Sequence, residues 1–160
     1  MKDIFPVITL YQPWATWIMR EWKTIETRTH NRFACLNKKT ILIHAGLTTD
    51  NSELVIENKY LNKDQIIQNP NEIVNGYILG KAYVYDYSEL NIIHSLKSLI
   101  DCGLTSPLRY GLFLENIEVF DSPIKESGEM GIWYYDIVKR QKVKKPKIQT
   151  ELFSPPTNTK

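Results

Sequence analysis

The apolar residues of this chain occur in short, irregularly spaced runs separated by turn residues, and this spacing limits the folds available to it. The β-prone runs of strand length are Ile8 to Leu10, Thr40 to Ala45, Tyr77 to Tyr87, Tyr110 to Phe120 and Gly131 to Val138. Gly80 is expected to form a bulge in the third run. The spacing is too irregular for a repeated parallel βαβ fold. We therefore predict an α+β fold, in which a small, strongly bent β-barrel or sheet carries helices on its flank.

Two helices are predicted between these runs. Pro13 suits a first helical turn, and the residues after it that form one apolar stripe at helical spacing are Trp14, Trp17, Ile18 and Trp22. Ser88-Glu89 is expected to cap a second helix that runs to about Asp101. Its predicted buried face consists of Leu90, Ile93, Leu96, Leu99 and Ile100. Residues 51–68 keep only a loose helical spacing, which indicates helical pieces.

Charge divides the 160 residues into three parts, although the formal net charge is only +2. Residues 1–45 carry 7 Lys and Arg against 3 Asp and Glu, residues 46–138 carry 6 against 14, and residues 139–160 carry 7 against 1. The last part cannot bury enough apolar surface to fold. We therefore predict one domain at 1–138 and a flexible basic tail at 139–160. The acidic middle would repel a polyanion and restrict a nucleic acid to one side.

Short patterns exclude several classes of protein. No run approaches the roughly 20 apolar residues of a membrane span, and no apolar signal segment follows Met1, so no membrane partner is expected. Cys35 and Cys102 are too few for a disulfide scaffold and form no CxxC pair, which predicts two reduced, partly buried thiols in a cytoplasmic protein. The three histidines form no ligand pattern, so we expect no metal and no cofactor.

Several segments, in order along the chain, resemble the ASCH domain family, which belongs to the PUA-like β-barrels. The matches to its QPW, GxKxxExR and IHA motifs are Gln12-Pro13-Trp14, Lys23-Thr24-Ile25-Glu26-Thr27-Arg28 and Ile43-His44-Ala45. The matches to its later strand and closing hairpin are Gly80-Lys81-Ala82, Leu114-Glu115-Asn116 and Gly128 through Trp133. Glu21 stands where GxKxxExR has glycine, which suggests that the helix ends differently, a residue later.

The resemblance implies a PUA-like barrel that binds nucleic acid, usually RNA, or a modified nucleoside. Some members of the family are ribonucleases, and others are amidohydrolases that act on acetylated cytidine. In those amidohydrolases a KTxT-type segment supplies Lys and Thr as the catalytic pair, and here Lys23 matches but Glu26 replaces the second Thr. A hydrolase could still use Lys23 and Glu26 as an acid–base pair, so both a binding module and an enzyme remain open.

Lys23, Glu26 and Arg28 place two cations around one carboxylate within six residues. In an extended segment Glu26 and Arg28 point to the same face, because side chains alternate with period two. An ionised glutamate could hold both donors ready for a phosphate, a base or a small anion. Two alternatives remain: Lys23 could lose its proton in a dry cleft and react, or the cluster could only fasten strand to helix.

Gln12, Trp14 and His44 complete the predicted ligand site. The Gln12 amide could read a base edge or cap the following helix. Trp14 could stack on a base or pack in the core. His44 ends an apolar strand, where a hydrogen-bonded core histidine is the commoner role.

The C-terminal segment Gln149-Thr150-Glu151-Leu152-Phe153 resembles the QxxLF peptide by which bacterial proteins dock onto the DNA-polymerase sliding clamp. Leu152 and Phe153 would enter an apolar pocket, while Gln149 would fix the register through hydrogen bonds. An accidental pentapeptide is the alternative. The Lys/Arg run from Lys139 to Lys147 would contact phosphates without sequence preference, or serve only as a solvated linker.

Overall fold

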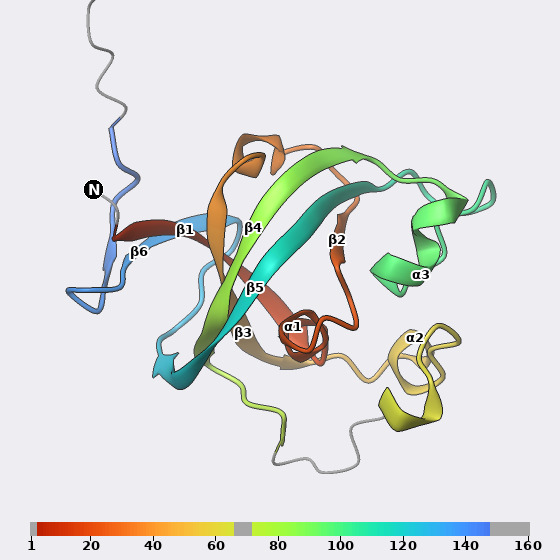
Figure 1. Cartoon of the computed structure of the whole chain (residues 1–160), viewed down its shortest axis with the longest axis horizontal. Coiled ribbons are helices and arrows are strands. Elements are labelled where there is room, and N and C mark those ends of the chain that lie inside the picture. The colour runs from red at the N-terminus through yellow and green to blue at the C-terminus, as the bar shows by residue number, and fades with distance from the viewer. Residues whose placement is uncertain (1–2, 66–71, 148–160) are drawn as a thin grey trace, which may run out of the picture.

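The computed structural model describes residues 3–65 and 72–147, which form one seven-stranded sheet with short helices (Figure 1). The strands are β1 (Ile4–Gln12), β2 (Ile25–Arg28), β3 (Thr40–Thr49), β4 (Tyr77–Glu89), β5 (Tyr110–Lys125), β6 (Ile132–Asp136) and β7 (Gln141–Val143). The α-helices are α1 (Trp14–Met19), α2 (Glu53–Ile56) and α3 (Ser95–Ser98), and the 3₁₀ turns are η1 (Ala34–Leu36), η2 (Lys63–Gln65) and η4 (Ile92–His94). The combination of one sheet with short helices confirms the predicted α+β class. Closure of the sheet into a PUA-like barrel stays a prediction.

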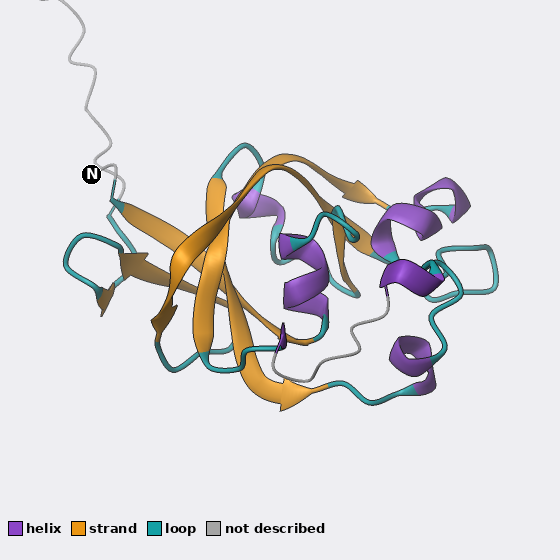
Figure 2. Ribbon diagram, turned by 60° about the horizontal axis from the view of Figure 1, so that its bottom comes forward, coloured by secondary structure: helices purple, strands orange, loops and turns teal. Residues whose placement is uncertain are grey.

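The strands follow one another across the sheet in the order β2-β5-β4-β3-β1-β6-β7. β1 and β3 run parallel, and the other neighbouring pairs are antiparallel. The sheet twists strongly, and α1 lies against it while α2 and α3 lie together at one end of the molecule (Figures 1 and 2). α1 contacts β1, and α3 contacts β2.

The main core lies where α1 meets one face of the sheet. Its buried members are Ile8, Leu10, Ala15, Ile18, Met19, Phe33, Leu36, Ile41, Ile43, Ala45, Leu79, Ala82, Val84, Leu112 and Leu114. Val7 and Leu42 point to the opposite face of the same strands, where they pack with Trp133 and Tyr135 of β6. Because β3 is buried on both faces, its sequence is a continuous apolar run rather than an alternating one.

β3 and β5 are longer than the sequence runs indicate, whereas β6 is shorter. β3 continues through Gly46 to Thr49, and β5 continues to Lys125. The bulge predicted at Gly80 is confirmed, because the register of β4 with β5 shifts between Ile78 and Gly80. A Cβ at Gly80 would lie 2.2 Å from the backbone carbonyl oxygen of Glu118, so this close approach requires glycine.

The helix predicted from Ser88 to Asp101 is wrong. β4 continues through Glu89, and the short turns η4 and α3 follow it. The expected buried face is divided: Ile93 and Leu96 are 77% and 64% exposed, whereas the other three residues are buried. The predicted helical pieces in residues 51–68 correspond to α2 and η2. In the part of the chain that the structure describes, no helix is long and apolar enough to cross a membrane.

The ordered sheet extends past the boundary predicted at Val138. β7 pairs with β6 through Tyr134 opposite Val143 and Asp136 opposite Gln141, so the first part of the expected tail is a strand. Lys142 is fixed there by Glu129, with 3.1 Å between Nζ and Oε1, and by a 2.9 Å hydrogen bond to the Ser127 hydroxyl. The segment with Gln149, Leu152 and Phe153 lies outside the described residues.

Candidate functional site

The turn after α1 delivers Lys23 to the site. The Glu21 N–H donates to the Ile18 carbonyl and the Trp22 N–H donates to the Trp17 carbonyl, at 2.9 and 3.0 Å, which is a Schellman motif. Glu21 has φ 58°, the left-handed conformation that glycine favours. The expectation that Glu21 shifts the helix end is therefore wrong, because this glutamate adopts the glycine-like geometry itself.

Lys23 is buried at the centre of the site, with 1% of its surface exposed. Its Nζ donates a 2.6 Å hydrogen bond to the carbonyl of Ser98, at the end of α3, and lies 3.6 Å from Glu26 Oε2. The same Nζ lies 5.0 Å from the centre of the Trp14 ring. Burial lowers the pKa of Lys23, and the Glu26 carboxylate opposes that shift.

Glu26 and Arg28 lie two residues apart in β2, and their side chains meet. Arg28 Nη2 is 3.4 Å from Glu26 Oε1, so the carboxylate has one cation on each of its oxygens. On its other side the Arg28 guanidinium lies 4.5 Å from the centre of the Phe33 ring. Glu26 thus holds two donors in place, as the alternating pattern of β2 indicates.

Trp14, Lys23, Glu26 and Arg28 all line one cavity of about 370 Å³, which we call the Lys23 cavity. Tyr11, Asp50 and Arg109 also line it, and sequence reasoning missed these three residues. The Trp14 indole N–H donates a 2.9 Å hydrogen bond to Asp50 Oδ2. Partial burial raises the pKa of Asp50, but hydrogen bonds from Trp14 and from the Ser52 backbone outweigh it and leave that pKa lowered. The cavity therefore contains cations, carboxylates and one indole edge.

Gln12 lies outside the lining of the Lys23 cavity, and both polar atoms of its side-chain amide are hydrogen-bonded within the protein. Its amide oxygen accepts a 3.0 Å hydrogen bond from the Thr16 N–H in the first turn of α1. Its amide nitrogen donates at 2.8 Å to the Val74 carbonyl. The side chain is completely buried, so the geometry favours the helix-capping alternative for Gln12.

His44 is also completely buried and does not line the Lys23 cavity. Its Nε2–H donates a 2.9 Å hydrogen bond to the Glu126 carbonyl, and its ring meets Trp133 edge-on at 5.6 Å. Burial lowers the pKa of His44, although the bond to the Glu126 carbonyl acts in the opposite direction. His44 therefore supports the loop after β5 instead of facing a ligand in the Lys23 cavity.

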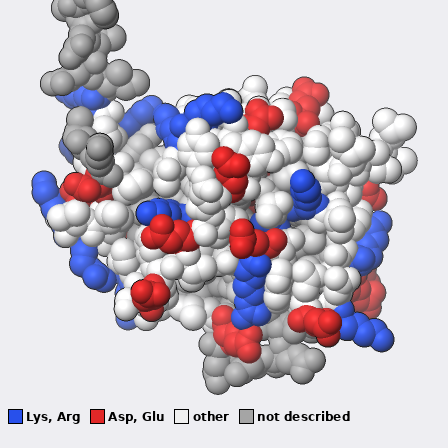
Figure 3. Space-filling model, viewed as in Figure 1, with Lys and Arg blue, Asp and Glu red and all other residues white. Residues whose placement is uncertain are grey.

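The cysteines differ from each other in exposure. Cys102 is buried behind α3, whereas Cys35 is exposed and so departs from the expected partial burial. Within residues 3–65 and 72–147, no group of three or more His, Cys, Asp and Glu side chains is placed to hold a metal ion. On the face shown in Figure 3, positive and negative side chains are interspersed, so charge on that face does not separate as it does along the sequence.

No protein-family model and no curated protein matches the chain. Among solved structures, the chain is similar to ASCH from Zymomonas mobilis over 75% of this chain and 72% of that chain, with 14% identity and a TM-score of 0.46. Two mutants of the same Zymomonas protein align over 75% of this chain and 74% and 72% of theirs, at 14% identity, with TM-scores of 0.44 and 0.42. The family named for these structures is the one that the QPW, KTIETR and IHA segments resemble.

Proposed function

We propose that this chain binds RNA or a modified nucleoside in the Lys23 cavity. The observation that carries the proposal is the joint presence, in one cavity of about 370 Å³, of the Trp14 indole and the Lys23–Glu26–Arg28 cluster. A cavity of this size suits a compact organic ligand, since small-molecule sites fall at roughly 300–1,000 Å³. The ASCH resemblance of the same residues implies RNA as the usual ligand.

The side chains of the cavity supply the contacts that a nucleotide needs. Trp14 offers a ring for stacking on a base, and the carboxylate of Glu26 accepts hydrogen bonds from base amino groups. Arg28 and Arg109 can donate to a phosphate or a base carbonyl. Arg109 Nε is buried and has no hydrogen-bond partner among the described residues, so it can donate to a ligand at little cost.

A binding screen with cytidine, N4-acetylcytidine, other nucleosides and five-residue RNA and DNA oligomers tests this proposal. Thermal shift identifies a ligand, because a molecule that binds only the native state raises the melting temperature. We expect Arg28→Gln and Trp14→Leu to weaken binding at least tenfold. Trp22→Leu is the matched control, since Trp22 lies outside the cavity lining, and its affinity should equal that of the wild type. Equal affinity in all four proteins would overturn the proposed site.

A hydrolase acting on RNA or an acylated nucleoside is the second candidate for the same cavity. It is favoured by the lowered pKa of Lys23 and by the 3.6 Å between Nζ and Glu26. In that mechanism Glu26 takes the proton of the attacking water, and the Lys23 ammonium returns a proton to the leaving group. The Ser98 hydrogen bond and the near-complete burial of Lys23 restrict its movement, which places binding first.

Turnover assays separate the two candidates. If the chain is a hydrolase, N4-acetylcytidine or an RNA oligomer is consumed, and Glu26→Gln lowers kcat by a much larger factor than it lowers ligand affinity. Wild-type protein that binds a ligand but releases no product would leave binding as the function. The control is a preparation of Glu115→Gln, which changes an exposed carboxylate on β5 away from the cavity.

Docking to the bacterial sliding clamp is proposed for the segment with Gln149, Leu152 and Phe153, on its sequence pattern alone. We expect the full chain to bind a purified clamp and the double variant Leu152→Ala/Phe153→Ala to lose that binding. Thr157→Ala, four residues after Phe153, is the control. Equal binding of the wild type and the double variant, or no binding by the wild type, would end this hypothesis.

A further inference from the structure

A larger cavity of about 1150 Å³ adjoins the Lys23 cavity. It lies between β1, β3, the segment after β2 and the loop that joins β5 to β6, and we call it the Arg32 cavity. Its lining includes Tyr11, Arg28, Arg32, Phe33 and Lys125. Of the ligand-site residues predicted from the sequence, Arg28 is the one that lines this cavity.

The two cavities share part of their walls. Thr9, Tyr11 and Arg28 line both of them. Arg28 stands at the junction, because its guanidinium pairs with Glu26 on the Lys23 side and covers Phe33 on the Arg32 side. Arg28 Nε is buried and makes no hydrogen bond within the described ranges, so one guanidinium N–H remains for a ligand at the junction.

Tyr11 is the second residue at the junction. It is 57% exposed, because successive side chains of β1 point to opposite faces and its buried neighbours Leu10 and Gln12 lie on the other face. An aromatic ring that projects between two cavities can stack on a base in either of them, and base–aromatic stacking tolerates any base.

The charges around the Arg32 cavity suit a phosphate chain. Arg28, Arg32 and Lys125 contribute cations, and Glu126 and Glu129 contribute carboxylates. Glu129 is already neutralised, because its Oε1 lies 3.1 Å from Lys142 Nζ. The apolar part of the wall includes Phe33, Leu47 and Ile132, against which a base can pack.

We propose that the Lys23 and Arg32 cavities are two subsites for consecutive nucleotides of a single-stranded nucleic acid. One nucleotide occupies the Lys23 cavity, the next occupies the Arg32 cavity, and Arg28 binds the phosphate that joins them. This inference rests on the proposed function, since it extends the same site to a second nucleotide. Single strands are the required form, because bases in a duplex are paired and stacked inside it.

Affinities for one nucleotide and for two test this arrangement. Uridine 5′-monophosphate, UpU, thymidine 5′-monophosphate and dTpdT are titrated by calorimetry against the wild-type chain. The expected result is that at least one dinucleotide binds tenfold or more tightly than its mononucleotide. If no mononucleotide, dinucleotide or nucleoside binds, the proposed function itself fails. If mononucleotides bind and neither dinucleotide binds more tightly, only the second subsite is overturned.

Variants of the Arg32 cavity give an independent test. Arg32→Gln removes a cation from it, and Thr48→Trp occupies part of its volume, while neither residue lines the Lys23 cavity. Both changes should weaken the dinucleotide tenfold, whereas the mononucleotide, which can still bind in the Lys23 cavity, should lose much less affinity. Lys97→Gln removes an exposed cation that lines neither cavity, and its affinities should equal those of the wild type. An equal loss for mononucleotide and dinucleotide in the Arg32 and Thr48 variants would contradict two separate subsites.

Discussion

At the scale of single residues, the two partners of the buried ion pair have unequal surroundings. Glu26 neutralises Lys23 at 3.6 Å and Arg28 at 3.4 Å. If Lys23 loses its charge, Glu26 still has Arg28 beside it. If Glu26 loses its charge, Lys23 remains a buried ammonium whose hydrogen bond is made to the neutral Ser98 carbonyl.

Removing the carboxylate should therefore cost more stability than removing the amine. We expect Glu26→Gln to lower the free energy of unfolding by about 3–5 kcal/mol, the range found when a buried pair loses one partner. Lys23→Met should cost less, and the double variant should be more stable than the sum of the two single losses predicts. Urea denaturation of the four proteins measures these differences. A larger loss in Lys23→Met than in Glu26→Gln would contradict this account.

His44 should make stability depend on pH. Its pKa is lowered from the usual value of 6.5 by burial, so below pH 6.5 the unfolded chain takes up a proton that the folded chain resists. The free energy of unfolding should fall as the pH falls from 6.5 through the lowered pKa, and should not change from this source above 6.5. Urea denaturation from pH 8 to pH 5 should show a smaller loss in His44→Gln than in the wild type. Parallel curves for the two proteins would rule out this role of His44.

At the scale of elements, the end of α1 contains strain that another residue would relieve. Glu21 adopts φ 58° at the position where a Schellman motif prefers glycine. For a residue with a Cβ, this conformation is less stable by roughly 1–2 kcal/mol, whereas glycine adopts it without that steric penalty. No ion pair offsets this conformational free energy, because the exposed Glu21 side chain pairs with no other described residue.

Glu21→Gly should stabilise the protein. The conformational gain is reduced by the greater freedom of glycine in the unfolded chain, about 0.4–1 kcal/mol, so a net increase of about 0.5–1 kcal/mol is expected in the free energy of unfolding. The midpoint of urea denaturation measures it. Glu21→Ala is the matched control, because it removes the carboxylate and keeps the Cβ, and it should give no gain. A lower midpoint for the glycine variant than for the alanine variant would show that the helix end carries no strain.

The elements that the sequence predicts well are those whose signal is local. The runs around β3, β4 and β5 are β-prone over their whole buried length, and Pro13 does precede α1. The helix expected from Ser88 fails because long-range pairing decides the outcome: Glu89 pairs with Tyr110 and extends β4. Leu99 then adopts φ 58° and ends α3, which a helical spacing of leucines does not reveal.

In the candidate site, the residues that are close in sequence are predictable, and those that come from distant segments are not. Lys23, Glu26 and Arg28 lie within six residues, so the alternation of β2 is enough to bring Glu26 and Arg28 together. Asp50 and Arg109 reach the cavity from distant parts of the chain, and only the folded sheet shows that they meet Trp14 there. Gln12 belongs to the same motif as Trp14, yet the motif does not show that its amide is used by Thr16 and Val74.

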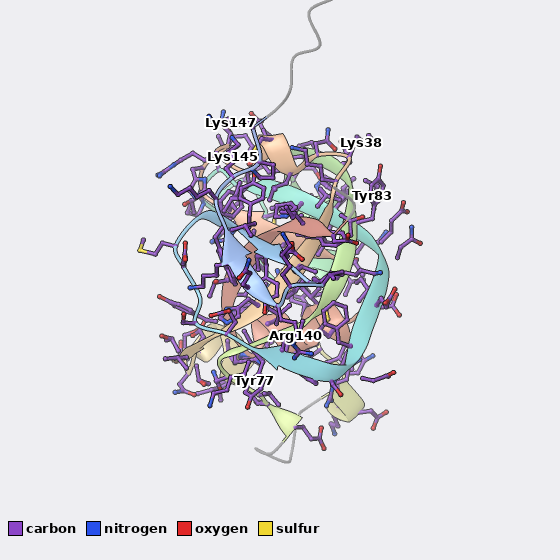
Figure 4. All side chains as sticks on the ribbon, turned by 90° about the vertical axis from the view of Figure 1, so that its left-hand side faces the viewer. Lys38, Tyr77, Tyr83, Arg140, Lys145 and Lys147 are labelled. Carbon is purple, nitrogen blue, oxygen red and sulfur yellow. The ribbon has the colours of Figure 1, made fainter. Side chains whose placement is uncertain are left out.

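At the scale of the whole molecule, a third hollow continues the path of the two cavities toward the C-terminal strand. Lys142, Lys144 and Lys145 line a hollow of about 460 Å³ beside β6 and β7. Glu129 and Ile132 line both this hollow and the Arg32 cavity, so the two are neighbours. Lys145 and Lys147 lie at the end of the molecule away from Tyr77 (Figure 4). A single strand that leaves the Arg32 cavity can therefore run along these lysines.

The lysines after β7 should contribute to affinity mainly through counterion release. Each phosphate contact by a single strand adds roughly 0.7 to the slope of log affinity against log salt concentration. Changing Lys144, Lys145 and Lys147 together to Gln should therefore reduce that slope by about 2 for a ten-residue oligo(U), while a mononucleotide keeps its affinity. Fluorescence anisotropy between about 50 and 200 mM salt provides the data.

The matched control changes the same number of lysines in the acidic segment, namely Lys59, Lys63 and Lys97 to Gln. These side chains are exposed and lie outside the Lys23 and Arg32 cavities and the hollow beside β7. If the strand follows one side of the molecule, this control keeps the wild-type slope, because its lysines meet no phosphate. Equal reductions in both triple variants would mean that the oligomer is attracted by overall charge and follows no defined path.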